Sequence, residues 1–307
     1  MTPPRFDPEL APVITALRAL RPSLSRLDEI PGRRELNAAD NWTVEKLAAA
    51  HPAYRVSEEH AGEVPLLVLR PPESVGVLYY VHGGGLIASS HLGQDARNVL
   101  AWSGEPNLTV VSPGYRLAPE HRYPAALEDC RAGLEWTAER FAGPLVLGGV
   151  SAGGGLAAAL ALLVRDRGGP ALAGQLLACP MLDDRNDTPS AIGLDGHGLW
   201  DRTANLIGWT AYLGDRRGTA DVPAYAAPAR AEDLSGLPPA FLDVGAVETF
   251  RDEVVAYANR IWQAGGDAEL HVWPGGFHGF DSLVPEAAIS RAARAARRTW
   301  LRRLLGQ

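Results

Sequence analysis

The chain has 307 residues, a net charge of −7 and an apolar fraction of 46%. This length is sufficient for one large hydrophobic core with a smaller cap. A nucleic-acid-binding protein would be basic, so the acidic balance argues against nucleic acid as a partner. No apolar run reaches the roughly 18 residues that cross a bilayer, and the N-terminus lacks the basic and apolar stretches of a secretory signal. We therefore expect a cytoplasmic protein.

The predicted elements begin with an amphipathic helical segment over residues 8–50, broken at Pro22 and Pro31. Residues 63–72 then predict a strand with polar flanks. Short apolar runs without polar alternation follow, as in strands buried on both faces of a parallel sheet. They cover 76–82, 108–113, 144–150, 174–180, 239–245 and 268–273. Helical spacing is found at 124–141, 152–168, 250–266 and 286–305. Strands that alternate with helices predict an α/β sheet.

Two regions lie outside this alternation. One is the N-terminal helical segment, residues 1–50, and the other is 183–225, which is rich in Asp, Gly, Trp and Pro. Because α/β sheets bind ligands at the carboxyl ends of their strands, an insertion there can cover the site as a cap. The final helix is rich in arginine, but in an acidic protein a solvated arginine face explains it better than a membrane-surface helix. We expect no stable membrane association.

Two cysteines, Cys130 and Cys179, lie in apolar stretches. Their spacing matches no zinc-site pattern, and the chain does not have the cysteine content of a disulfide framework. We therefore expect two buried free thiols and neither a metal nor a cofactor.

The sequence GGVSAGG at 148–154 contains a Gly-x-Ser-x-Gly pattern centred on Ser151. Chance can produce this pattern, but here a predicted strand precedes the serine and a helix of small residues follows it. That context is typical of the sharp, strained strand-to-helix turn that presents a nucleophilic serine. A phosphate-binding loop is the alternative, but no lysine follows. We predict that Ser151 is a nucleophile and that the N–H of Ala152 faces the developing oxyanion.

A serine nucleophile needs a base, and His278 follows the strand 268–273 at the same predicted sheet edge as Ser151. We predict His278 as this base, oriented by a carboxylate. The candidates after the strand 239–245 are Asp243, Glu248, Asp252 and Glu253. Glu248 alone lies in the loop between that strand and the next helix. The order Ser151, Glu248, His278 is that of the triad in α/β-hydrolases.

The sequence HGGG at 82–85 directly follows another predicted strand. Lipases and esterases often take oxyanion-binding N–H groups from such a loop, because bare glycine backbone can approach the substrate closely. We predict Gly83 and Gly84 as donors, with Gly85 permitting the turn and His82 anchoring the loop.

With these residues placed, the chain resembles the hormone-sensitive-lipase-like branch of α/β-hydrolase esterases (bacterial family IV), from about 76 to 285. The similar segments are YYVHGGG, YRLAPEHRYPAALED (115–129), GVSAGGGLAAA (149–159), VETFRDEVVAYANRI (247–261) and PGGFHGF (274–280). There are two departures. Val150 stands where the branch commonly has an acid, and Glu248 stands where it usually has Asp, which leaves Asp243 and Asp252 open as the triad acid.

The resemblance implies an α/β-hydrolase fold with a mostly parallel central sheet of about eight strands, flanked by helices. It implies a helical cap built from residues 1–50 and about 183–225, on a catalytic domain over 51–307. It further implies hydrolysis of short-acyl carboxylic esters, small-molecule substrates and a possible homodimer. The candidates for lining a pocket under the cap are Phe6, Trp200, Trp209 and Tyr212, for which packing within the cap is an equally open role.

Two other functions stay open. The same triad could serve an amidase or another acyl-transfer hydrolase. The chain could also be a small-molecule-binding protein on a hydrolase scaffold, but receptors of that kind typically lose the histidine that is present here as His278.

Overall fold

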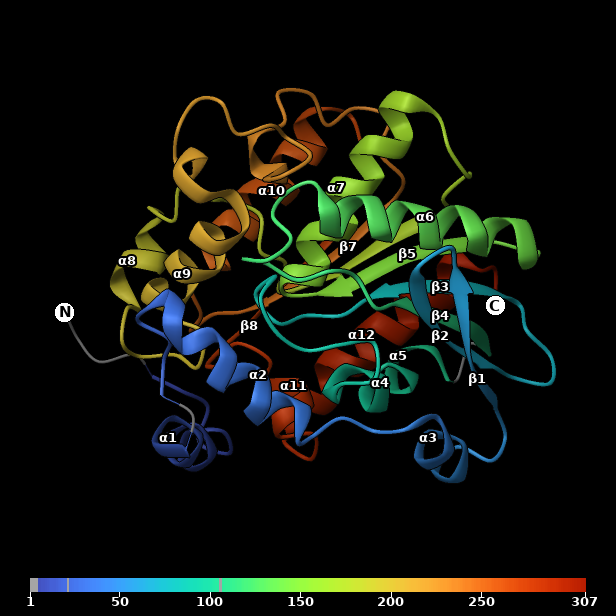
Figure 1. Ribbon diagram of the computed structural model, residues 1–307, viewed down its shortest axis with the longest axis horizontal. Coiled ribbons are helices and arrows are strands. Elements are labelled where there is room, and N and C mark those ends of the chain that lie inside the picture. Colours follow the sequence, from blue (N-terminus) through green and yellow to red (C-terminus); the bar gives the residue numbers. More distant parts are fainter. Residues whose placement is uncertain (1–4, 21, 105–106) are drawn as a thin grey trace.

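The computed structural model describes residues 5–20, 22–104 and 107–307, so residues 1–4 and 21 of the predicted N-terminal cap segment lie outside it. An eight-stranded sheet runs through the centre of the molecule (Figure 1). Its strands are β1 (Arg55–Ala61), β2 (Val64–Arg70), β3 (Gly76–Val81), β4 (Leu108–Pro113), β5 (Leu145–Val150), β6 (Gly174–Ala178), β7 (Ala240–Gly245) and β8 (Ala268–Trp273). Their spatial order is β1-β2-β4-β3-β5-β6-β7-β8.

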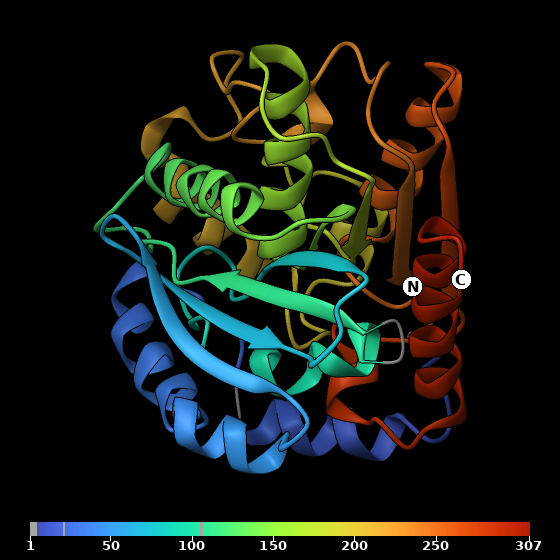
Figure 2. The ribbon, with the colours of Figure 1, turned by 90° about the vertical axis from the view of Figure 1, so that its right-hand side faces the viewer.

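The sheet is mostly parallel, as predicted. Only the β1–β2 and β2–β4 pairs are antiparallel, and the neighbours from β4 to β8 are all parallel. The sequence reading missed β1, which forms a hairpin with β2 at one edge of the sheet (light blue in Figure 2). Its sequence RVSEEHA is largely exposed and polar, because an edge strand has only one neighbour and little apolar cover.

Helices cover both faces of the sheet. The α-helices are α1 (Ala11–Leu20), α2 (Ile30–Ala38), α3 (Val44–Ala50), α4 (Gln94–Asn98), α5 (Leu100–Ser103), α6 (Ala125–Arg140), α7 (Ala152–Arg167), α8 (Pro189–Gly193), α9 (Arg202–Leu213), α10 (Arg251–Gln263), α11 (Phe280–Leu283) and α12 (Ala288–Leu304). Short 3₁₀ turns are formed by Leu27–Glu29, Gly214–Arg216 and Pro228–Arg230. Helices α6, α7 and α10 lie on one face, and α5 and α12 lie on the other (Figure 1).

The central strand β3 shows why its residues form a continuous apolar run. Tyr79 packs into the core under α6 and α7, whereas the next residue, Tyr80, contacts Trp102 of α5 edge-on at 5.2 Å. Alternate side chains point to opposite faces of a strand, so a strand covered on both faces must be apolar throughout. The prediction that residues 268–273 form a strand buried on both faces is wrong. This strand, β8, is partly exposed along its length because it is the other edge of the sheet.

The two predicted cap regions meet in space. Helices α1 and α2, and the segment before α9, contribute residues to one cavity that also reaches the ends of β3 and β5. Helix α3 lies elsewhere, packed beside β1 with Leu47 in the core. No helix in the described ranges has both the length and the apolar character needed to cross a membrane. Cys130 and Cys179 are buried and unpaired, as predicted.

Candidate active site

Ser151 lies in the sharp turn between β5 and α7. Its backbone has φ 56° and ψ −123°, which is a strained conformation for a residue with a side chain. Three hydrogen bonds hold it there: its N–H donates to the Ala178 carbonyl, and its carbonyl accepts from the N–H groups of Gly155 and Met181 at 3.0 Å. Neighbouring backbone therefore maintains the strained turn.

The glycines on either side of Ser151 are required by close packing. A Cβ atom at position 149 would lie 2.4 Å from the carbonyl oxygen of Gly153, and one at position 153 would lie 2.1 Å from that of Val81. Both atoms belong to backbone, which cannot move aside cheaply. This explains the Gly-x-Ser-x-Gly pattern physically, since only a chain without these side chains can make the turn.

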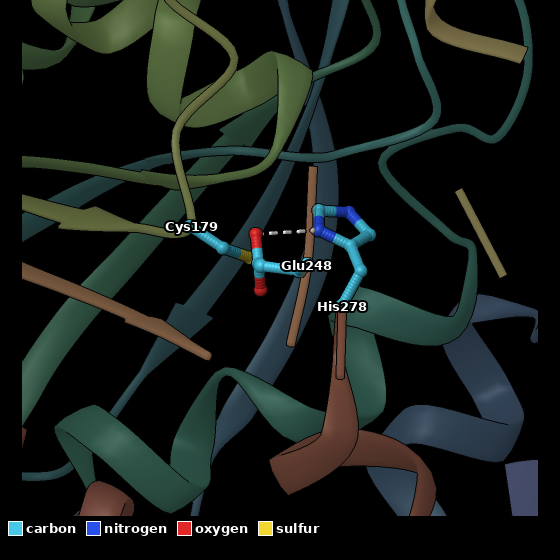
Figure 3. A group of neighbouring side chains, drawn as sticks. All are labelled: Cys179, Glu248 and His278. Carbon is cyan, nitrogen blue, oxygen red and sulfur yellow. Dashed lines mark hydrogen bonds and ion pairs between the residues drawn. The ribbon is translucent and has the colours of Figure 1, made fainter. Parts of the chain in front are cut away.

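His278 and Glu248 lie beside Ser151, in the predicted order. The Nε2 atom of His278 is 2.9 Å from the Ser151 Oγ. Its Nδ1 atom is 3.2 Å from Oε1 of Glu248, the contact drawn in Figure 3. The other carboxylate oxygen of Glu248 accepts the N–H of Gly245 at 3.2 Å. Phe250 meets the imidazole edge-on at 5.2 Å. The ring is therefore held from two sides, with one nitrogen facing the serine and the other the carboxylate.

The two alternative acids are occupied elsewhere. Asp243 accepts hydrogen bonds from Trp273 and from the buried guanidinium of Arg297 at 2.7 Å. Asp252 accepts the backbone N–H of Ser190 in α8 at 2.7 Å, which ties the 183–225 insertion to α10. Of the three open candidates, the structure brings only Glu248 to His278.

Cys179 also lies next to this pair (Figure 3). Ligand atoms of Cys179, Glu248 and His278 lie within 4.8 Å of one another, a set of donors that a thiophilic metal ion could use. Burial, with Glu248 as the next cause, raises the pKa of the Cys179 thiol well above its ordinary value. A protonated thiol is a poor ligand, and Glu248 already pairs with His278. These three residues therefore suit a serine–histidine–carboxylate triad beside a neutral thiol better than they suit a metal site.

The HGGG loop corrects one prediction. The N–H of Gly83 donates to Oδ2 of Asp95 at 2.8 Å, so it is not available to bind an oxyanion, and its assignment as a donor is wrong. The N–H groups of Gly84, Gly85 and Ala152 donate to no acceptor within the described part of the chain. Gly84 and Gly85 have φ values of 115° and 63°, which glycine adopts readily. The free N–H donors of the loop are therefore those of Gly84 and Gly85, one residue later in the chain than predicted.

His82 anchors this loop from below. It is buried, its Nδ1 atom lies 2.8 Å from the Gly83 carbonyl, and its ring stacks on Tyr115 at 4.2 Å. The Tyr115 hydroxyl in turn donates to the His82 carbonyl at 2.9 Å. Burial lowers the pKa of His82 to about 3, so its imidazole is neutral at ordinary pH. These contacts agree with an anchoring role.

A cavity of about 220 Å³ opens above Ser151 and His278. Of the four aromatic residues predicted to line it, only Trp200 does, with its ring packed against Gly85. Trp209 and Tyr212 are 1% exposed, because their side of α9 packs into the core rather than over the cavity. Phe6 packs edge-on against Phe277 at 6.3 Å. The expectation that these three line the pocket is therefore wrong.

Sequence reasoning missed several polar residues of the cavity, among them Asn37 of α2 and Gln94 and Asp95 of α4. Asp95 is twelve residues from the glycine that it contacts, in a five-residue helix with no strong periodic signal. The only hint was an acidic residue shortly after the HGGG loop. Asn37 lies in a polar helix that is remote in the sequence and gave no sign of its position.

Comparison with known proteins agrees with this geometry. A family model described as alpha/beta hydrolase fold matches residues 78–282. The carboxylesterase NlhH of Mycobacterium tuberculosis is 34% identical over 258 residues, covering 77% of this chain and 80% of NlhH. Esterase LipI of the same organism is 31% identical, covering 92% and 91%. A solved structure of a bacterial heroin esterase has a TM-score of 0.84 at 34% identity and covers 99% of both chains. The chain belongs to the hormone-sensitive-lipase-like branch of the α/β-hydrolases, a family of carboxylic-ester hydrolases.

Proposed function

We propose that the protein hydrolyses short-acyl carboxylic esters at Ser151 through an acyl-enzyme intermediate. The observation that carries this proposal is the continuous contact from Ser151 Oγ through His278 to Glu248, at 2.9 and 3.2 Å. It lies at the base of a cavity whose size suits a small ester. Family membership supports the same reaction class.

In the first half of the reaction, His278 Nε2 takes the proton of Ser151 as Oγ attacks the ester carbonyl. Glu248 holds the imidazole in the tautomer whose Nδ1–H points to the carboxylate, and it stabilises the imidazolium that forms. The protonated His278 then gives its proton to the departing alcohol. Water, activated by the same histidine, attacks the acyl-enzyme and regenerates Ser151.

Both tetrahedral intermediates carry an oxyanion that needs donors placed in advance. We assign this role to the N–H groups of Gly84, Gly85 and Ala152, because these have no partner within the described residues. Ala152 begins α7, where the first N–H groups of a helix are free and the helix dipole favours negative charge. Asp95 holds Gly83 and thereby positions the loop that carries two of the three donors.

The test is hydrolysis of p-nitrophenyl acetate and butyrate by the wild type and by Ser151→Ala. We expect the variant to lose at least about 10⁴-fold in kcat while it folds normally, because the nucleophile is lost without a change in packing. A fluorophosphonate probe should label the wild type at Ser151 and leave the variant unlabelled. A wild type that neither turns over esters nor reacts with the probe would overturn the proposal and favour a binding protein.

A further inference from the structure

Helix α2 presents two polar residues to the cavity and an apolar one to solvent. Arg33 and Asn37 are half-buried and line the cavity, as does Asp40 just after the end of α2, whereas Leu36 on the outer side of the helix is 50% exposed. Arg33 and Asn37 are four residues apart, which places them on one side of the helix. A helix at a protein surface usually has the opposite arrangement. A polar side turned inward over a binding cavity points to a ligand that needs it.

The orientation of α2 is held by strong contacts. Arg34, next to Arg33, donates to the carbonyls of Ile87 and Ala118 at 2.7 and 2.6 Å and forms a bidentate pair with Glu120. Ile87 belongs to the turn that follows the HGGG loop. Rotation of α2 that would turn Asn37 outward would break these bonds. The position of the Asn37 side chain over the cavity is thus a built feature of the fold.

Two side-chain amides at this cavity have no hydrogen-bond partner among the described residues. The side chains of Asn37 in α2 and Gln94 in α4 line the cavity, and neither forms a hydrogen bond with any described residue. Each amide carries two N–H donors and one carbonyl acceptor. Pockets bind small ligands through a few polar groups of this kind set among apolar ones. The apolar part of this cavity is supplied by Leu17, Ile87, Val150, Leu199 and Leu283, together with the Trp200 ring.

The charged groups at the cavity are already engaged. Asp95 accepts the Gly83 N–H, the Arg33 guanidinium donates to the Pro22 carbonyl, and Asp40 also has an interaction partner. A charged ligand would need an unpaired counter-charge, whereas the groups left over are neutral and can both donate and accept. Alcoholic hydroxyls have the same dual capacity.

We propose that the cavity selects esters whose alcohol half carries free hydroxyl groups, and that Asn37 and Gln94 bind those hydroxyls. The inference rests on the proposed ester hydrolysis at Ser151. Since that proposal assigns a short acyl chain to the substrate, we place the hydroxyl groups in the alcohol half. The substrate class is therefore a short-chain ester of a small polyol.

The test compares two esters of equal size. Glycerol 1-monoacetate carries two hydroxyls, and 2-methylbutyl acetate has methyl groups in their places. The variants are Asn37→Leu and Gln94→Met, which keep the side-chain volume and remove the amide. Leu36→Asn, on the exposed side of α2, is the matched control. Acetate release gives kcat/KM for each pair, and thermal unfolding shows that each variant is folded.

We expect each amide substitution to lower kcat/KM for glycerol monoacetate by about tenfold, the loss expected for one hydrogen bond. The value for 2-methylbutyl acetate should stay the same or rise, and Leu36→Asn should change neither. Equal effects on both esters, or no effect on either, would overturn the inference while ester hydrolysis itself stands. A wild type that cleaves neither of these esters nor the p-nitrophenyl esters would overturn the proposed function, and this inference with it.

Discussion

At the carboxyl ends of the strands, the reactive side chains beneath the cavity are paired with one another, whereas on the α2 side the amide of Asn37 has no hydrogen-bond partner among the described residues. Ser151 contacts His278, His278 contacts Glu248, and Asp95 holds Gly83. The strained Ser151 turn is supported by close backbone contacts. These two sides of one cavity suit two tasks. Bond-making chemistry needs groups held in place before the substrate arrives, and recognition needs groups that gain their partner only on binding.

The largest effect that tests this comparison is expected at Glu248. Replacing it with Gln keeps the size but removes the charge, and the imidazole can then take the wrong tautomer. We expect kcat to fall about 10³- to 10⁴-fold with little change in KM. Glu248→Asp keeps the charge on a side chain one methylene shorter, so it should lose about ten- to a hundredfold. Steady-state kinetics on p-nitrophenyl acetate measures both, and equal, wild-type rates in the two variants would mean that this carboxylate does not orient His278.

A smaller effect is expected at Asp95, which reaches the reaction only through the loop. Asp95→Leu leaves the Gly83 N–H without its acceptor, so the neighbouring donors of Gly84 and Gly85 should lose their placement. We expect kcat to fall about ten- to a hundredfold, somewhat less than the loss of an oxyanion donor itself, with KM nearly unchanged. Asp95→Asn keeps a carbonyl oxygen for Gly83 and should stay within a few-fold of the wild type. If both variants lost only thermal stability, with turnover per folded molecule intact, the contact would be purely structural.

The smallest effect concerns the two thiols, and it tests how well the groups at the strand ends are protected from solvent. Burial raises the pKa of Cys130 and of Cys179 well above the ordinary value. A raised thiol pKa leaves the group protonated at pH 8, and only the thiolate reacts. We expect a disulfide reagent at pH 8 to label neither cysteine quickly in the native protein and both after unfolding in guanidinium. Fast labelling of Cys179 in the native protein, with loss of activity, would show that the region around Glu248 and His278 opens readily to solvent. The reactive groups would then not be held in place before the substrate arrives.

The central strands and the helices between them could be predicted because their signal is local. A strand such as β3, covered on both faces, must be continuously apolar, and α7 after Ser151 is rich in small helix-forming residues. The edge strand β1 escaped because an exposed strand needs no apolar pattern. Helix α4 escaped because five residues are too few to show a helical period.

The order Ser151, Glu248, His278 predicted the three side chains that the structure brings together, since each follows a parallel strand and all such strands end at one edge. Aromatic residues in the segments 1–50 and 183–225 gave no comparable constraint. Whether Trp200 or Trp209 faces the cavity depends on which side of α9 and its preceding loop packs on the core. The spacing of apolar residues within one helix does not show which part of the fold each side of that helix contacts.

The sequence by itself determined the elements and the strand ends at which the reactive side chains stand, because these depend on local pattern and chain order. Only the tertiary structure decided that Glu248 rather than Asp243 reaches His278, that Asp95 occupies the Gly83 N–H, and that α2 turns Asn37 toward the cavity. Each of these is a contact between segments distant in the chain. Such contacts depend on which donor or acceptor is already satisfied by another part of the fold, and no local pattern of residues records that.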